Sequence, residues 1–341
     1  MTARSFFFSP AERSYHPAMS PLDVPDGFST RLASPEDADD LADLVNQVNV
    51  AEVGFPWTSA DEIRDDLTAP GRDPENDLLL VADDGTTVGY LTMSVDPESP
   101  TEWHHLAFVR PSAWGHGLNT WLLQVGEGRA RAAVGAAPES GPASLRVSRW
   151  STNQAAGSLF ERLGYMRVRT FHEMRIELVD PPAAPVVPDG IVIRPFMRDR
   201  DARPAHATLA EAFEDHWGRG FDPFDQWVHR FVDGEGSGFD PGLWFVALDG
   251  EEIVGAICCR ERTPRSPDAA SVDVLGVRRP WRGQGIGRAL LLTAFVAVHS
   301  RGGEAVELGV DAANPTGATR LYEDVGMHEL QSFEVWEKSL P

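Results

Sequence analysis

Residues Val277 to Leu291 read V-R-R-P-W-R-G-Q-G-I-G-R-A-L-L. The apolar, β-branched run before them, Val272 to Val277, indicates a strand. The apolar segment after them, Ala289 to Val298, has no Gly or Pro and indicates a buried helix. The turn between the two, Arg282 to Gly287, has glycine at every second position, so its backbone N–H groups can converge at the positive end of the helix dipole. This arrangement predicts a phosphate-binding loop.

Two common nucleotide-binding motifs do not fit this turn. The Walker motif ends in Gly-Lys-Ser/Thr and the turn has no Lys, whereas the dinucleotide motif G-x-G-x-x-G has its third glycine one residue after Gly287. The turn resembles the pyrophosphate loop R/Q-x-x-G-x-G/A of the Gcn5-related N-acetyltransferase (GNAT) superfamily, with Arg282, Gly285 and Gly287 at the motif positions. A glycine-rich helix start that binds no ligand is the alternative interpretation.

The length of the chain suits two domains, and its negative net charge suits a cationic small-molecule partner. The chain has 341 residues, enough for two domains of roughly 150 residues each. Its apolar fraction of 42% is sufficient to fill two hydrophobic cores. The formal net charge of -22 argues against nucleic acid or an anionic membrane as a partner, although solubility explains the charge equally well.

The cysteines and the apolar runs bear on the compartment. Cys258 and Cys259 are adjacent in an apolar run, so they should alternate between the faces of a strand and stay reduced in the core. Phe6 to Phe8 is too short for the apolar part of a signal peptide, and no apolar run is long enough to span a membrane. We therefore expect a cytoplasmic protein.

The chain repeats itself. A weaker copy of the loop spans Arg110 to Asn119, and further along F-E-R-L-G-Y at 160–165 corresponds to Y-E-D-V-G-M at 322–327. A stretch with four prolines, 179–190, lies between the two halves and is typical of a linker. The sequence therefore predicts two copies of one domain.

By the resemblance, each copy has the GNAT fold. This is an α/β (α+β) domain with a mixed, largely antiparallel sheet flanked by helices. The fourth and fifth strands splay apart, and the pantetheine of acetyl-CoA inserts between them. We expect an N-terminal extension at 1–27, an N-terminal GNAT-like domain at 28–178, a Pro-rich linker at 179–190 and a C-terminal GNAT domain at 191–341.

Acetyl transfer from a thioester to an amine needs a neutral amine and a proton for the departing thiolate. The resemblance places Tyr322 near the CoA sulfur as the proton donor, and a phenol with a pKa of about 10 is protonated at neutral pH. Packing in the core is the alternative role for Tyr322. Asp273 stands in an otherwise apolar strand, where it either lines the amine cleft as a base or faces solvent.

The resemblance also supplies the cofactor contacts, and no metal is expected among them. The sequence has one more residue between Asn314 and Tyr322 than the family motif N-x-x-A-x-x-L-Y-E-x-x-G-F. The residues expected to contact acetyl-CoA are Leu275, Gly276, Val277, Arg282, Gly283, Gln284, Gly285, Ile286, Gly287, Arg288 and Asn314.

Acceptor specificity in this fold comes mainly from the first helices and the final strands. The corresponding segment of the second half contains Glu214, Asp215, His216 and Trp217, an acidic and aromatic cluster that suits a cationic amine. Aromatic packing with the acids in water is the alternative. The cluster and the two repeats resemble the tandem-domain relatives of the mycothiol synthase type.

The first half departs from the motif at several positions. Phe160 replaces the tyrosine, Trp114 replaces the leading arginine, and Asn119 brings a Cβ to a glycine position where we expect a turn with positive φ. His105, beside His104, is the counterpart of Asp273 and is expected to be half-exposed on its strand, with a role as a base as the alternative. We predict that the first half does not catalyse.

The sequence therefore suggests a tandem acetyltransferase acting on a primary amine of a small molecule. No cysteine lies near the loop or Tyr322 in sequence, which favours direct attack in a ternary complex over an acyl-enzyme. The rival hypothesis is a non-catalytic acyl-CoA-binding sensor or scaffold.

Overall fold

The computed structural model describes most of the chain. The described residues are 23–69, 72–95, 101–136, 143–214, 216–217, 221–234, 237–262, 269–314 and 316–340. They form two compact units, which we call the N-terminal unit (23–169 with 333–340) and the C-terminal unit (170–332). None of the helices in this described part combines the length and apolar character needed to span a membrane.

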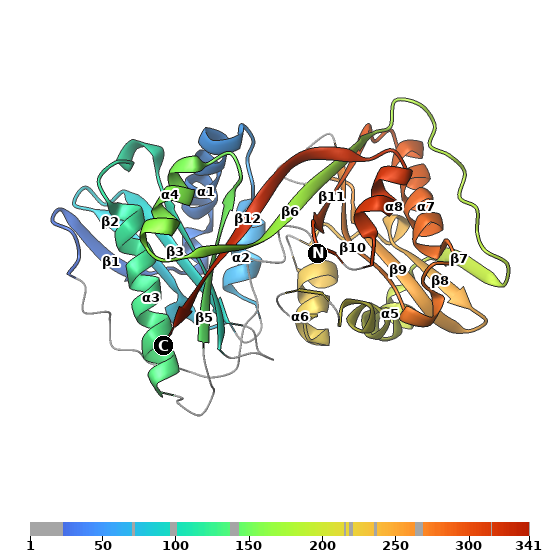
Figure 1. Cartoon of the computed structure of the whole chain (residues 1–341), viewed down its shortest axis with the longest axis horizontal. Coiled ribbons are helices and arrows are strands. Elements are labelled where there is room, and N and C mark those ends of the chain that lie inside the picture. The colour runs from blue at the N-terminus through green and yellow to red at the C-terminus, as the bar shows by residue number, and fades with distance from the viewer. Residues whose placement is uncertain are drawn as a thin grey trace. The chain divides into compact units, whose positions relative to one another are not determined.

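The N-terminal unit has one sheet, in the order β1-β2-β3-β4-β5-β12, flanked by helices (Figure 1). Its neighbouring strands run antiparallel, except that β4 and β5 are parallel. The strands are β1 Phe28–Leu32, β2 Asp77–Ala82, β3 Thr87–Val95, β4 Glu102–Val109, β5 Ala143–Trp150 and part of β12 His328–Leu340. The helices are α1 Ala38–Val53, α2 Ala60–Leu67, α3 Leu118–Ala136 and α4 Gln154–Arg162.

The C-terminal unit repeats this plan, with strand order β7-β8-β9-β10-β11-β6 and one parallel pair, β10 with β11. Its strands are β6 Met166–Glu177, of which the last part belongs to this unit, β7 Ile191–Pro195, β8 Phe245–Asp249, β9 Glu252–Arg260, β10 Ala269–Val277 and β11 Ala305–Asp311. Its helices are α5 Arg198–Phe213, α6 Phe224–Val228, α7 Ile286–Ser300 and α8 Ala318–Asp324. The predicted mixed sheet flanked by helices is thus confirmed.

The parallel strands pair only where they begin. In the C-terminal unit β10 pairs with β11 over residues 269–271 and 305–307, and in the N-terminal unit β4 pairs with β5 over residues 102–104 and 144–146. Beyond these residues each pair separates, as the resemblance implied. Each sheet therefore opens between its two parallel strands.

Each unit takes its last strand from the other half of the chain. Residues 171–177 of β6, which follow the first repeat, pair with β11 of the C-terminal unit. Residues 333–340 of β12, which follow the second repeat, pair with β5 of the N-terminal unit. In Figure 1 the red β12 lies beside β5, and the green β6 lies beside β11. The repeat in the sequence did not predict this exchange.

The sheet of the C-terminal unit is covered on both faces. Cys259 packs in the cluster beneath α7 with Leu290 and Phe295, whereas Cys258 packs in a second cluster with Trp227 and Trp244. Both thiols are free, and burial raises their pKa. The predicted alternation of the two cysteines between the strand faces is confirmed.

Candidate active site

The C-terminal unit contains a cavity of 390 Å³ where β10 and β11 separate. It is bounded by the second half of β10, the turn before α7, the end of β11 and helix α8. The predicted site residues that line it are Asp273, Leu275, Gly276, Val277, Arg282, Gly283, Gly285, Ile286, Gly287, Arg288, Asn314, Tyr322, His216 and Trp217. The structure thus brings the two ends of the second repeat into one cavity.

Two glycines shape the turn. Gly283 and Gly285 have φ of 74° and 87°, in the left-handed region that favours glycine. Gly285 is the N-cap of α7 and provides no side-chain cap, so the first-turn N–H groups are not satisfied by a capping side chain. The geometry suits an anion at the positive end of the helix dipole.

The third glycine, Gly287, does not have the positive φ that we expected at this position of the turn. Gly287 lies inside α7 and is not among the glycines with positive φ. A Cβ at this position would lie 3.4 Å from Leu321 Cδ2, which is ordinary contact. Its counterpart Asn119 is likewise inside a helix, α3, and no described residue other than glycine has a positive φ. The prediction that Asn119 occupies a turn with positive φ is therefore wrong.

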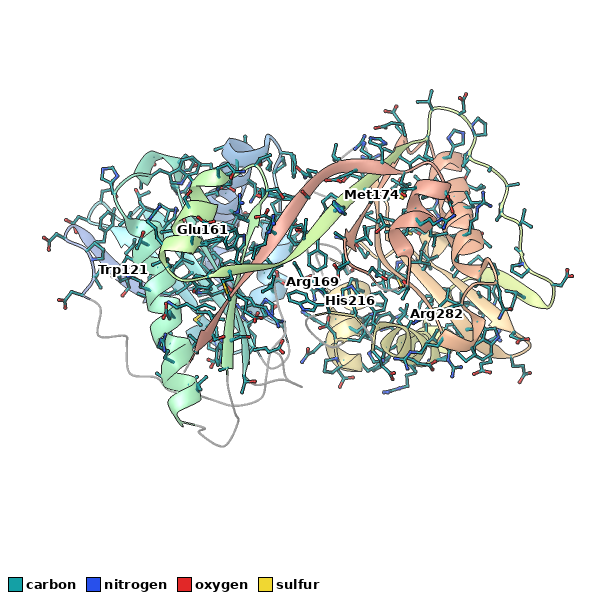
Figure 2. The ribbon with its side chains drawn as sticks, in the orientation of Figure 1. Trp121, Glu161, Arg169, Met174, His216 and Arg282 are labelled. Atoms are coloured by element: carbon teal, nitrogen blue, oxygen red, sulfur yellow. The ribbon has the colours of Figure 1, made fainter. Side chains whose placement is uncertain are left out.

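Arg282 braces the turn from within. Its Nε donates to the Val277 carbonyl at 3.0 Å and its Nη2 to the Ala212 carbonyl at 2.9 Å, which ties the turn to β10 and α5 (Figure 2). Gln284 does not line the cavity, because its side chain donates to the Pro280 carbonyl at 3.1 Å. The motif arginine thus has a structural task in addition to facing the cavity.

Tyr322 is buried on α8 and lines the cavity. Its side chain is 8% exposed, and burial raises the pKa of the hydroxyl to about 12. The hydroxyl makes no hydrogen bond to another residue in the described ranges. A phenol in this state keeps its proton throughout the neutral pH range.

Asp273 is buried rather than exposed. Its side chain is 3% exposed, so the alternative that it faces solvent is wrong. A β-bulge between Val272 and Val274 changes the register of β10 on β9 at this residue. Its carboxylate accepts hydrogen bonds from Arg260, whose Nη2 lies 2.6 Å from Oδ1, and from Ser271 Oγ at 3.1 Å. Asp273 is thus fixed by a buried ion pair.

Gly276 allows helix α5 to approach the strand. A Cβ at this position would lie 2.9 Å from Leu209 Cδ2 and 3.0 Å from Ala212 Cβ, so a larger residue would displace the helix. The neighbours Leu275 and Val277 line the cavity. A close approach between α5 and β10 is therefore present at Gly276, whereas the β-bulge of the strand lies earlier, at Asp273.

Asn314 fixes the turn before α8. Its Oδ1 accepts hydrogen bonds from the Thr316 backbone N–H at 2.8 Å and from the Thr316 hydroxyl at 2.6 Å. Asn314 lines the cavity although the sequence has an additional residue between it and Tyr322.

The predicted acceptor cluster divides in two. Glu214 is exposed, pairs with Arg279 at 3.2 Å and does not line the cavity, while Asp215 lies outside the described residues. The rings of His216 and Trp217 line the cavity and contact Phe171, with centroid distances of 6.5 Å and 6.4 Å (Figure 2). Sequence reasoning missed Phe171, because this residue lies on β6 and reaches the unit through the strand exchange.

The N-terminal unit has a cavity of its own, of 680 Å³, in the corresponding opening between β4 and β5. Its glycines Gly115 and Gly117 have φ of 84° and 79°, so the shape of the turn is retained. Trp114 donates from Nε1 to the Val109 carbonyl at 2.7 Å, which reproduces the bond that Arg282 makes to Val277. The backbone of the loop is therefore intact in both units.

The histidines of the N-terminal unit are buried, against our expectation of half-exposed side chains. His104 and His105 are 9% and 1% exposed. His105 Nε2 lies 3.0 Å from the Tyr165 hydroxyl, and burial lowers the pKa of His105 to about 3. His105 is thus a neutral core residue at physiological pH.

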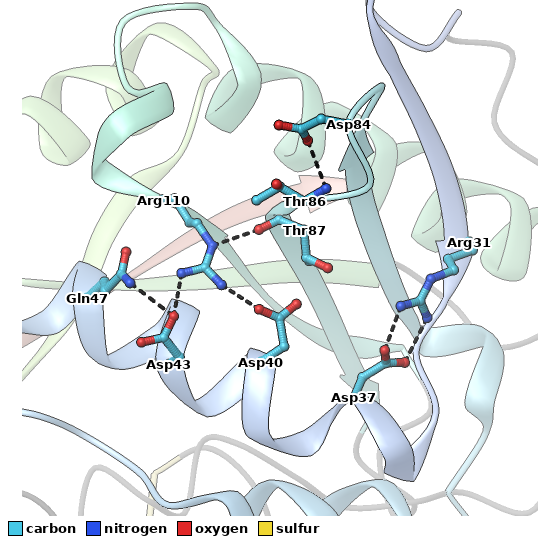
Figure 3. A network of polar contacts seen from close by, with 9 residues as sticks. All are labelled: Arg31, Asp37, Asp40, Asp43, Gln47, Asp84, Thr86, Thr87 and Arg110. Carbon is cyan, nitrogen blue, oxygen red and sulfur yellow. Dashed lines mark hydrogen bonds and ion pairs between the residues drawn. The ribbon is translucent and has the colours of Figure 1, made fainter.

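An arginine after the fourth strand anchors the first helix in both units. Arg110 donates from Nη2 to Asp40 at 2.5 Å, from Nη1 to Asp43 at 2.6 Å and from Nε to the Thr87 carbonyl at 2.7 Å (Figure 3). Its counterpart Arg278 donates to Glu211 of α5 at 2.6 Å. The first helix and the start of the loop are therefore held together in the same way twice.

Comparison with known proteins decides the family. The model of the acetyltransferase (GNAT) family matches residues 42–165 and 205–327, one match in each repeat. The chain belongs to this family. The GNAT matches lie on either side of the proline-rich stretch at 179–190.

Relatives of this GNAT protein are similar over most of its length. A mycothiol acetyltransferase of Thermobispora bispora is 32% identical over 253 residues, 73% of this chain and 79% of the relative. The corresponding protein of Actinosynnema mirum is 30% identical over 86% of this chain and 92% of its own length. A crystal structure of a GCN5-related N-acetyltransferase from Sphaerobacter thermophilus is 32% identical, with a TM-score of 0.74 over 93% of this chain and 97% of that one.

A tandem GNAT protein from the clavulanic acid biosynthesis pathway shares the fold, with a TM-score of 0.67 at 16% identity over 92% of this chain and 99% of that one. The GNAT family uses acetyl-CoA as its co-substrate. This GNAT chain is therefore an acyl-CoA-dependent N-acetyltransferase, which favours the enzyme over a non-catalytic sensor.

Proposed function

We propose that the C-terminal unit transfers the acetyl group of acetyl-CoA to a primary amine of a small molecule, by direct attack in a ternary complex. The observation that carries this proposal is the meeting of two features in one cavity. The turn at Gly283 and Gly285 leads into α7 without a side-chain cap, and the buried hydroxyl of Tyr322 lies in the same cavity.

The residues present fit acetyl-CoA. When bound, acetyl-CoA supplies a thioester carbonyl that a neutral amine attacks. The N–H groups of the turn and of the first turn of α7 would hold its pyrophosphate, and Arg288 and Asn314 line the same cavity. The part of β10 that pairs with β9 but not with β11, Leu275 to Val277, would offer backbone groups to the pantetheine in the opening beside β11.

Tyr322 is our candidate for the general acid, because burial keeps its hydroxyl protonated and no described residue forms a hydrogen bond with that hydroxyl. Asp273 is our candidate for the group that accepts the amine proton through water, with Arg260 and Ser271 fixing its carboxylate. Cys258 and Cys259 have pKa values raised by burial and do not line the cavity, which supports direct attack rather than an acyl-enzyme.

The acceptor would approach the wall formed by His216 and Trp217, whose rings pack on the buried Phe171. Aromatic faces attract cations, so this wall suits an amine that arrives as ammonium. The similar proteins named mycothiol acetyltransferase support a small-molecule acceptor rather than a protein.

The proposal is tested by measuring thiol release from acetyl-CoA with a panel of primary amines. Each amine is paired with the alcohol of the same skeleton, which lacks the attacking nitrogen. We expect thiol release in step with formation of the N-acetyl product for the amines only. Equal release with the alcohols, or release without acceptor product, would contradict the assignment.

A further inference from the structure

We propose that the cavity of the N-terminal unit is a second binding site, which takes an organic ammonium group on Glu52. This cavity is separate from the proposed catalytic cavity and is lined entirely by residues of the N-terminal unit. Its volume of 680 Å³ lies in the range of small-molecule sites, which is roughly 300 to 1,000 Å³.

Glu52 is the one carboxylate among the described residues that line this cavity. It stands in the last turn of α1, at the negative end of the helix dipole, where a carboxylate is disfavoured. Burial also raises its pKa to about 7, against a smaller opposing effect of its hydrogen bond with Asn153. A cation that enters the cavity would therefore stabilise the ionised form of this carboxylate.

The polar partner of Glu52 is already fully engaged. Asn153 donates from Nδ2 to Glu52 Oε1 at 2.6 Å, while its Oδ1 caps α4 by accepting from Ala156 N at 2.9 Å. Both groups of this amide are therefore used within the protein. In the C-terminal unit, no carboxylate of a described residue accepts a hydrogen bond from the counterpart Asn314.

None of the other ionisable groups that line the cavity, among the described residues, supplies a positive charge to Glu52. Arg149 on β5 is held by Glu334 at 2.7 Å and by the Asn153 carbonyl at 2.7 Å. His105 on β4 has its pKa lowered by burial to about 3 and is neutral. Arg162, the remaining one, is an exposed residue near the end of α4. The cavity thus combines a desolvated carboxylate with the aromatic surfaces of Phe108, Trp114 and Phe160.

The test is calorimetric titration of the full-length chain with benzylamine, and with benzyl alcohol as the uncharged probe of the same shape. Glu52→Gln keeps the size of the side chain and an oxygen that can accept from Asn153, but removes the charge. The matched control is Glu161→Gln, the same charge change on an exposed residue of the same unit. We expect Glu52→Gln to weaken benzylamine binding by at least about tenfold, and Glu161→Gln to leave it unchanged.

Proton release distinguishes this site from binding elsewhere on the chain. Because an ammonium lowers the pKa of Glu52 from about 7, binding at pH 7 should release up to about half a proton per benzylamine in the original chain, and none in Glu52→Gln. The affinity should rise as the pH rises through about 7, since the carboxyl ionises while an aliphatic amine stays protonated.

Three outcomes would overturn the proposal. These are unchanged benzylamine affinity in a folded Glu52→Gln variant, equal affinity for benzyl alcohol and benzylamine, and binding of two acetyl-CoA molecules per chain with no Glu52-dependent amine binding. The last outcome would make the cavity a cofactor pocket. None of the three bears on turnover in the C-terminal unit, which is measured separately by thiol release.

Discussion

In the C-terminal unit the helix after the fifth strand presents Tyr322 to the cavity, and in the N-terminal unit the corresponding helix presents Phe160. The two rings are similarly buried, at 8% and 6% exposure, so the packing of the helix is retained while the hydroxyl is absent. Arg282 and Trp114 are different side chains at corresponding positions. Each donates a hydrogen bond to the carbonyl that ends the preceding strand. A bond that shapes the loop can thus be made by another side chain, whereas Phe160 has no hydroxyl to take the role that we propose for Tyr322.

The polar contacts near the splayed strands differ as well. Asn314 accepts hydrogen bonds within its own turn, whereas Asn153 donates to Glu52. One cavity thus contains the proposed acid, Tyr322, and the other contains a carboxylate, Glu52.

The largest effect is expected from truncation after Ser332, which removes residues 333–340 from the N-terminal unit. The side chains of Phe333, Val335, Trp336 and Leu340 are buried, and together they account for about 6 to 12 kcal/mol of burial free energy. This is comparable with the whole stability of a domain. We expect urea denaturation to lose the cooperative transition of that unit.

The control for the truncation is Ser339→Ala, because Ser339 is exposed on the same strand and should change stability by less than about 0.5 kcal/mol. A second form of the experiment is a fragment of residues 191–341, which lacks the strand that pairs with β11. A fragment that unfolds as cooperatively as the intact unit would show that the exchanged strand is dispensable.

The next effect is expected from Gly285→Asp, measured by calorimetry with acetyl-CoA. Gly285 has φ of 87°, and the new carboxylate would stand where we place the pyrophosphate. An uncompensated charge of this kind costs about 3 to 5 kcal/mol, so affinity should fall by at least about a hundredfold. Gly117→Asp, with a similar backbone conformation at φ of 79°, is the matched change and should leave turnover unaffected. Equal loss of activity in both variants would contradict the proposal that only the C-terminal unit catalyses.

Tyr322→Phe should lower kcat by about a hundredfold while the dissociation constant of acetyl-CoA stays nearly unchanged, as expected for loss of a general acid. Adding Phe160→Tyr to this variant should not restore turnover. Steady-state kinetics with a responsive amine provides the measurement. Weakened acetyl-CoA binding in Tyr322→Phe would identify Tyr322 as a packing residue instead.

The smallest effect concerns pH and the stability of the N-terminal unit. Burial raises the pKa of Glu52 from 4.5 to about 7, so the folded state favours the neutral carboxyl. This contribution is fully present below about pH 4.5 and is lost as the pH rises through about 7. Stability at pH 8 should therefore lie about 1 to 3 kcal/mol below that at pH 4.5 from this group alone, and Glu52→Gln should remove that part. Identical pH profiles for the two proteins would contradict the burial argument.

Much of the fold and of the candidate catalytic cavity could be predicted from the sequence. The glycine spacing predicted the turn at Gly283 and Gly285, because positive φ at these positions depends on glycine alone. The repeat predicted the order of strands, and the residues of the β10 end, the turn and α8 do line one cavity. These features are local, so neighbouring residues determine them.

The missed features depend on partners that are distant in sequence. β6 and β12 occupy the same place in the two repeats, and their alternating patterns suit either sheet, so the sequence does not choose between them. Phe171, the buried residue that packs against His216 and Trp217, consequently escaped notice. The ion pair of Asp273 with Arg260 escaped for a related reason, since it depends on the register of β9 at a bulge.

The exchange of strands also sets an order in time. β12 follows every other described element along the chain, so the sheet of the N-terminal unit cannot be completed until the ribosome has synthesised the C-terminal unit. Until then β5 has an unpaired edge, which is the kind of surface that chaperones cover and that aggregates when left exposed. The N-terminal unit is therefore synthesised first but completes its sheet last.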